Sequence, residues 1–217
     1  EDNVEIPAAF KMMLENLQHV KGMATDSEEK YIAKMISGLP IETMRSLVIK
    51  DGVLKKCKDG SKEVNIPNNV KTIDVAAFKS CEKLETVVIS ENTEVIKEEA
   101  FRGCKRIKSI HIPEKVKFLG ESVFRDCISL TDLSIDNGDI EIGERAFENC
   151  PSLKNVRLPD KLAEIYGGVF NSCKAMEHIE LPRNLTILGE SAFAGCIKLK
   201  EIIIPDNVTK IDDMAFS

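Results

Sequence analysis

The sequence predicts an α/β repeat solenoid, in which one 23-residue unit is copied and stacked. From residue 78 to the end, phenylalanine occupies every 23rd position without insertion or deletion, and cysteine follows it three residues later. Each unit also contains a short stretch where apolar residues alternate with others, which is typical of a strand with one buried face. Both columns are predicted to belong to the buried structural core. They are Phe78, Phe101, Phe124, Phe147, Phe170, Phe193 and Phe216, and Cys81, Cys104, Cys127, Cys150, Cys173 and Cys196.

Each unit is predicted to contain one strand, a corner and a short return. The strand follows from inward-facing positions two residues apart, such as Val87 and Ile89 or Ile110 and Ile112. Proline comes next in most units and ends the strand, because it has no N–H to donate to the ladder. The segment from the phenylalanine to the cysteine predicts a short helical or 3-10 return. Like strands then stack in parallel, and seven of them form one continuous sheet about 34 Å long on one face.

The solenoid is predicted over residues 46–217, with a hairpin lead-in over 46–66 and about seven turns, the last one truncated. Asp51-Gly52 between two apolar runs is a strong hairpin signal. Residues 1–45 lack the repeat and show helical spacing, which predicts an N-terminal helical cap on the first turn. Ser217 ends the chain in mid-unit, so we expect that the natural protein continues or that this uncapped C-terminal edge packs on another molecule, including end-to-end self-association.

Composition disfavours two classes of partner. The formal net charge of −6 offers no basic surface for nucleic acid, and Trp is absent. No apolar run approaches the roughly 18 residues of a membrane span, so membrane insertion is not expected.

The cysteines are predicted to be structural, buried free thiols. Six of the seven occupy one equivalent position in successive units, and a stacked column requires equivalence, not pairing. Cys57 lies outside this column and is the thiol for which we expect exposure.

The outward positions of the strands are the candidate binding residues, since they vary in charge and size while the inward positions do not. The alternative is that they are merely solvated. The candidates are Thr86, Val88, Ser109, His111, Asp132, Ser134, Asn155, Arg157, His178, Glu180, Glu201 and Ile203.

No catalytic or cofactor chemistry is predicted. His111 and His178 lie three strands apart, about 14 Å, and cannot share a metal ion. The sequence contains no nucleophile elbow, phosphate loop or Cys-x-x-Cys pair. Asp136-Asn137-Gly138-Asp139 has the oxygen chemistry of a calcium loop but lacks its further ligands, so a tight turn is the favoured interpretation.

The stretches Ile66-Pro67 through Leu84 and Ile204-Pro205 through Ile211 resemble the BspA-like leucine-rich repeats, also called the Treponema pallidum type. That unit has the form Leu-x-x-Ile-x-Ile-Pro, Val-x-x-Ile-Gly and Ala-Phe-x-x-Cys, and the resemblance covers about residues 47–217. Only Gly120, Gly143 and Gly189 keep the glycine of the motif, and Val123 and Val169 replace its alanine. The resemblance implies a right-handed leucine-rich-repeat superhelix, a surface location, adhesion to other proteins and no catalytic residue.

The leading hypothesis is a non-enzymatic recognition module that binds a protein or glycan partner through the outward strand face, extracellularly or at the cell surface, as an adhesin does. The alternative is a structural spacer or assembly element of a longer protein, whose active part lies outside this fragment.

Overall fold

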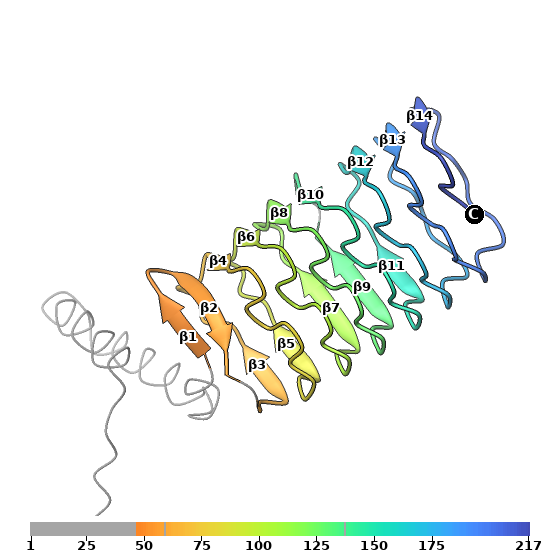
Figure 1. The fold of residues 1–217 in the computed structure, drawn as a ribbon. Helices are drawn as coiled ribbons and strands as arrows, with labels where there is room; N and C mark the ends of the chain where they lie inside the picture. The colour runs from red at the N-terminus through yellow and green to blue at the C-terminus, as the bar shows by residue number, and fades with distance from the viewer. Residues whose placement is uncertain (1–46, 59, 137) are drawn as a thin grey trace, which may run out of the picture. The chain divides into compact units, whose positions relative to one another are not determined.

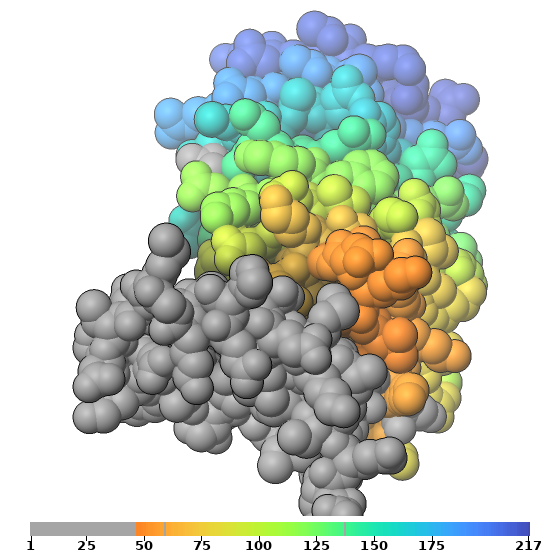
Figure 2. Space-filling model, turned by 90° about the vertical axis from the view of Figure 1, so that its left-hand side faces the viewer, coloured from red at the N-terminus to blue at the C-terminus, as the bar shows by residue number. Residues whose placement is uncertain are grey.

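The computed structural model describes residues 47–58, 60–136 and 138–217. They form a β-solenoid of about seven turns, each of roughly 23 residues. The helical cap predicted for residues 1–45 lies outside the described residues. In the space-filling view, the turns between residues 47 and 217 follow one another as successive bands (Figure 2).

The solenoid begins with an antiparallel hairpin. Strand β1 (Leu47–Lys50) pairs with β2 (Val53–Cys57), with Lys50 opposite Val53. The two residues between them, Asp51 and Gly52, both have positive φ, 51° and 72°. Left-handed conformations at both central positions are those of a type I′ hairpin turn, for which Asp-Gly is a preferred pair. This is the hairpin that the Asp51-Gly52 pair predicts.

A first row of strands lies along one side of the turns (Figure 1). It consists of β3 (Glu63–Asn65), β5 (Thr86–Val88), β7 (Ser109–Ile112), β9 (Asp132–Ile135) and β11 (Asn155–Arg157). Strand β3 pairs with β5, and β7, β9 and β11 form a second sheet, all parallel and with each residue opposite the one 23 positions away. The prediction of one continuous sheet is therefore wrong. The row is interrupted between β5 and β7, and residues 178–180 and 201–203 form no strand.

A second row of two-residue strands runs along another side of the same turns (Figure 1). Its members are β4 (Thr72–Ile73), β6 (Val95–Ile96), β8 (Phe118–Leu119), β10 (Glu141–Ile142), β12 (Glu164–Ile165), β13 (Ile187–Leu188) and β14 (Lys210–Ile211). Strands β4, β6, β8 and β10 extend the sheet that β1 and β2 begin, and β12, β13 and β14 form a further sheet. The sequence predicts a sheet on one face only, because two-residue strands are too short to show an alternating pattern.

The returns are turns, which corrects the prediction of helical or 3-10 segments: the described residues contain no helix. The N–H groups of Ser122, Phe124 and Asp126 donate to carbonyls of the following turn at 2.9, 2.8 and 3.0 Å. Ser122 and Asp126 also have φ of 55° and 64°. A helix requires negative φ throughout and N–H groups that bond within the segment. These returns instead use alternate N–H groups to join successive turns.

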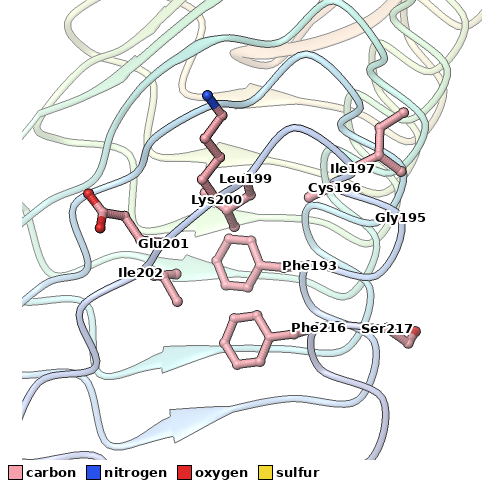
Figure 3. A pocket seen from close by; sticks show the side chains of 10 residues that line it. All are labelled: Phe193, Gly195, Cys196, Ile197, Leu199, Lys200, Glu201, Ile202, Phe216 and Ser217. Atoms are coloured by element: carbon pink, nitrogen blue, oxygen red, sulfur yellow. The ribbon is translucent and has the colours of Figure 1, made fainter.

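The phenylalanines form a continuous stack inside the solenoid. Neighbouring ring centroids are separated by 4.7 to 5.7 Å, and interplanar angles lie between 4° and 18°. Rings from Phe78 to Phe193 are fully buried. Phe216 was predicted to belong to the buried core, but it is 43% exposed because it stacks on Phe193 from one side only. Figure 3 shows these last two rings next to each other, with Ile202 beside them.

The cysteines lie beside the ring stack and are buried. Cys104, Cys127, Cys150, Cys173 and Cys196 are free thiols, and each donates from Sγ to the backbone carbonyl of a phenylalanine one turn earlier, at 3.1 to 3.4 Å. Burial raises the pKa of all five thiols, that of Cys104 to about 12. Cys57 is also buried, with 6% exposure, so the expectation that it is exposed is wrong. It belongs to β2, which places it against the first turns.

Candidate binding face

The outward side chains of the first strand row, together with those of residues 178–180 and 201–203, form what we call the strand face. Alternation along each strand buries Val87, Ile110 and Leu133 and directs their neighbours outward. Of the twelve candidate binding residues, Ser134 is half-buried and the others are exposed. Val88 and Ile203 are large apolar residues on this face, and Ile203 is 83% exposed.

A groove of about 1390 Å³ crosses four consecutive turns on the strand face. Eight of the twelve candidates line it, namely Ser109, His111, Asp132, Ser134, Asn155, Arg157, His178 and Glu180. The other four, Thr86, Val88, Glu201 and Ile203, lie on turns at either end and are not part of the groove. The structure therefore brings together the central candidates and separates the outer ones from them.

The groove extends from β7, β9 and β11 onto the next turn, where residues 175 and 177–184 line it without forming a strand. Ile179 of that turn is still buried, so the turn remains attached to the core. Leu158, Leu181 and Pro182 add apolar lining at the corner that follows the strands.

The carboxylate of Asp132, which lines the groove, accepts two side-chain hydrogen bonds. Thr131 Oγ1 donates to its Oδ2 at 2.5 Å, and Asn155 Nδ2, from the neighbouring strand, donates to its Oδ1 at 2.6 Å. These two hydrogen bonds lower the pKa of the Asp132 carboxyl, the first of them contributing most. Asp132 is therefore a fixed negative charge at neutral pH.

The two histidines of the groove, His111 and His178, come from different turns of the solenoid. The described part of the chain contains no group of three or more His, Cys, Asp or Glu side chains that could hold a metal ion. His111 instead has its Nε2 3.4 Å from Asp136 Oδ2.

The Asp136–Asp139 segment behaves as a tight turn where it is described. The N–H of Gly138 donates to Asp136 O at 2.8 Å, and Asp139 lies 3.5 Å from Lys161 Nζ. A Cβ at Gly138 would come within 2.7 Å of Glu114 O, so the close passage of the preceding turn requires glycine here. These contacts engage the two carboxylates with cationic or imidazole partners, which supports the tight-turn interpretation.

Several groove residues were not among the candidates. The polar and charged ones are Lys154, Asp160, Glu177, Arg183 and Asn184. Lys154 and Glu177 directly precede the outward columns, while Asp160 and Arg183 directly follow the corner prolines Pro159 and Pro182. The corner prolines recur in the sequence at the repeat spacing. The positions that directly follow them could therefore have been added to the candidate binding residues.

No helix among the described residues has the length and apolar character needed to cross a membrane.

Solved structures support the fold. A leucine-rich repeat protein from Bacteroides ovatus is 30% identical, with a TM-score of 0.63 over 77% of this chain and 46% of that chain. A leucine-rich repeat protein from Eubacterium ventriosum is 25% identical, with a TM-score of 0.54 over 67% of this chain and 46% of that one. The chain thus spans about half the length of these two proteins. The T. pallidum leucine-rich repeat protein, 22% identical, matches 75% of this chain and 91% of its own with a TM-score of 0.60, which shows a shared fold.

A comparison with curated proteins gave no match. The family described as "BspA type Leucine rich repeat region (6 copies)" matches residues 47–177 and 94–217. These two ranges together cover the whole solenoid, including the turns that carry the groove. The chain therefore belongs to the BspA-type leucine-rich repeat family.

Proposed function

We propose that this chain is a non-enzymatic recognition module that binds a protein or glycan partner through its strand face. One observation carries the proposal: eight residues that point outward from four consecutive turns line a single groove of about 1390 Å³. Concave sites with a few fixed polar groups are typical of ligand recognition, and stacked turns supply the rigid scaffold.

The variation of these residues supports the proposal. Along the strand face, His111, Ser134, Arg157 and Glu180 occupy equivalent positions and differ in charge and size. Inside the solenoid, equivalent positions either repeat the same residue, as the phenylalanines do, or remain apolar, as Ile110 and Leu133 do. A partner that contacts several turns would meet a different side chain on each, which is how a repeat array achieves specificity.

The test is a charge reversal on the strand face. Immobilised wild-type chain, Arg157→Glu and Glu180→Lys are screened against a random peptide display library and a glycan array. Each reversal is expected to abolish or redirect the binding of ligands that wild type captures. Glu190→Lys changes an exposed carboxylate on a return and serves as the matched control. Ligands that bind wild type and both reversals equally would contradict the assignment of this face.

A structural role, as a spacer or assembly element within a longer protein, is the second proposal. It is supported by apolar side chains exposed on the last described turn, among them Ile211 at 50% and Phe216 at 43%. A hollow of about 420 Å³ lies in this region. Figure 3 shows Leu199, Ile202 and Phe216 among the side chains that line it. A further turn or the end of a second copy would bury them.

Sedimentation velocity tests self-association through this edge. The chain is expected to associate as its concentration rises, and Phe216→Ser with Ile211→Ser to remain monomeric. A wild-type chain that stays monomeric at every concentration would exclude end-to-end association.

We further propose an extracellular or cell-surface location, a proposal supported by family membership alone. Protease shaving of intact source cells checks it, because a surface protein is digested while cytoplasmic markers remain.

A further inference from the structure

We infer that the groove recognises a polypeptide segment that carries an acidic side chain, and that Arg157 and Arg183 are the groups that bind this carboxylate. The inference rests on the proposed function of the strand face and names the chemical class of its partner. It follows from how the arginines of the described chain are paired.

Every described arginine outside the groove is paired with a carboxylate. Arg102 lies 3.4 Å from Asp126, and Arg106 lies 3.5 Å from Glu85. The remaining two pairs join Arg125 to Glu148 at 3.2 Å and Arg145 to Glu121 at 3.6 Å. These four guanidinium groups therefore have their charge partners within the fold.

The two arginines that line the groove have no such partner. Within residues 47–58, 60–136 and 138–217, neither Arg157 nor Arg183 lies at ion-pairing distance from a carboxylate, and both are exposed. Arg157 ends β11 and Arg183 follows Pro182 on the next turn, so they reach the same corner of the groove from adjacent turns. Guanidinium groups bind carboxylates in a planar, two-point geometry, and arginine is enriched among the residues that dominate binding energy.

Apolar residues adjoin both arginines in the sequence and line the same groove. Leu158 and Leu181 are half-buried and Pro182 is buried, and all three line the groove. An ion pair formed next to apolar side chains is better shielded from water than one on an open surface and is correspondingly stronger. The corner is therefore suited to a side-chain carboxylate that is attached to an otherwise apolar or neutral backbone.

Carboxylates in the same groove exclude a polyanion as the preferred partner. Asp132, Asp160, Glu177 and Glu180 line it together with the cations. A heavily sulfated glycan would bring many negative charges against these four groups, and like charges in proximity repel. A peptide can instead place one carboxylate at the arginines and neutral or basic groups elsewhere.

The lining also disfavours a neutral glycan. Among the residues that the structure describes, no Phe, Tyr or Trp lines the groove. Sugar rings present apolar C–H faces that pack on flat aromatic rings, so the groove lacks the surface on which such rings stack. Of the partner classes open to the strand face, a polypeptide is the one whose chemistry matches the groove.

The experiment selects ligands without presupposing their identity. The chain of residues 1–217 is immobilised and panned against a random linear peptide library, and in parallel applied to an array of neutral and sulfated glycans. Selected peptides are synthesised, and their affinities are measured by calorimetry for wild type, Arg157→Ala, Arg183→Ala and the control Arg145→Ala. Each peptide is also made with its acidic residues amidated to Asn or Gln. His178→Trp, which fills the groove without altering its arginines, reports whether a ligand binds there at all.

The inference predicts that selected peptides are enriched in Asp and Glu. Each groove arginine variant is expected to weaken binding about tenfold, a change of about 1.4 kcal/mol, while Arg145→Ala has no effect. Amidated peptides should bind wild type more weakly by at least the same factor. The loss on amidation should be smaller for each arginine variant than for wild type, because one of the two partners of the carboxylate is already absent. Urea midpoints of all variants confirm that each is folded.

Three outcomes contradict the inference. The first is a peptide or glycan whose binding is blocked by His178→Trp but whose affinity is unchanged by Arg157→Ala and Arg183→Ala. This result would overturn the inference and leave the proposed function standing. Capture of sulfated glycans in preference to peptides would overturn it in the same way. If no ligand of either class is sensitive to His178→Trp, the proposed function itself fails, and the inference fails with it.

Discussion

The thiol of Cys150 donates a hydrogen bond to the backbone carbonyl of Phe124, one turn earlier, with an Sγ–O distance of 3.2 Å. The same carbonyl accepts the N–H of Cys127 at 3.2 Å. Because the carbonyl is buried and has two lone pairs, the thiol satisfies an acceptor capacity that water cannot reach. The cysteine column therefore links successive turns by hydrogen bonds as well as filling the core.

Substitutions at Cys150 separate these two roles. Serine and alanine are similar in size, but only serine retains a donor. We expect Cys150→Ser to be more stable than Cys150→Ala by about 1 kcal/mol, the usual net value of a hydrogen bond. Urea unfolding followed by circular dichroism measures the difference. If the column only packs, the order reverses, because a buried hydroxyl without a partner is destabilising.

The buried thiols predict a loss of stability in alkaline solution. Burial raises the pKa of Cys104 from its ordinary value of 9.0 to about 12, and that of Cys196 to about 11. The unfolded chain ionises first, so the stabilisation from these neutral thiols is complete below pH 9 and is lost as the pH rises through 11 to 12. We expect the free energy of unfolding to fall over this interval, as measured by urea titration at a series of pH values.

The control for this pH dependence is the double variant Cys104→Ser with Cys196→Ser. Serine does not titrate in this pH range. The free energy of unfolding of the double variant should therefore decline less steeply above pH 9 than that of wild type. Equal slopes for the two proteins would show that other groups, such as lysines, cause the loss.

The repeat register was predictable because one buried side chain, phenylalanine, recurs at constant spacing. The interruption of the first strand row was not. Ile179 alternates with exposed neighbours as Ile110 does, yet only Ile110 lies in a paired strand. Period two reports burial of one face, and it does not report whether the backbone joins the ladder. The conformation of the returns could not be predicted either, because Ser122 and Asp126 adopt positive φ although neither is glycine.

The residues that line the groove were predicted in part, for the same physical reason. Residues that alternate along a strand, such as Arg157, are assigned to the outward face by the pattern alone. Arg183 and Asp160 follow corner prolines, where no alternation exists to assign a direction. Their convergence with β11 depends on how adjacent turns stack, which is a property of the folded array.

Gly120 is predicted to be required by the close approach of two turns. A Cβ at this position would come within 2.3 Å of the backbone nitrogen of Glu98 on the preceding turn. We expect Gly120→Ala to lower the free energy of unfolding by about 1 to 3 kcal/mol, since backbone atoms have to shift. The matched control is Gly167→Ala, whose Cβ would meet its nearest atom, Glu190 O, at an ordinary 3.4 Å. Equal urea midpoints for the two variants would contradict the role of Gly120.

The aromatic stack predicts different costs at its centre and at its end. Phe124 is fully buried between two parallel rings, with centroids 5.1 Å from Phe101 and 5.5 Å from Phe147. Removing its ring leaves a cavity in a rigid column, so we expect Phe124→Ala to cost about 3 to 5 kcal/mol. Phe216 contacts one ring and is partly hydrated already, so Phe216→Ala should cost much less.

Urea unfolding curves show whether the two variants lose different amounts of unfolding free energy or the same amount. Because a repeat array is stabilised by contacts between neighbouring turns, loss of the central ring should also separate the transition into two steps. Phe216→Ala should keep a single transition near the wild-type midpoint. If both variants lose the same free energy, the core is not limited by ring-to-ring packing, and the turns are held together mainly by the backbone hydrogen bonds of the strands and returns.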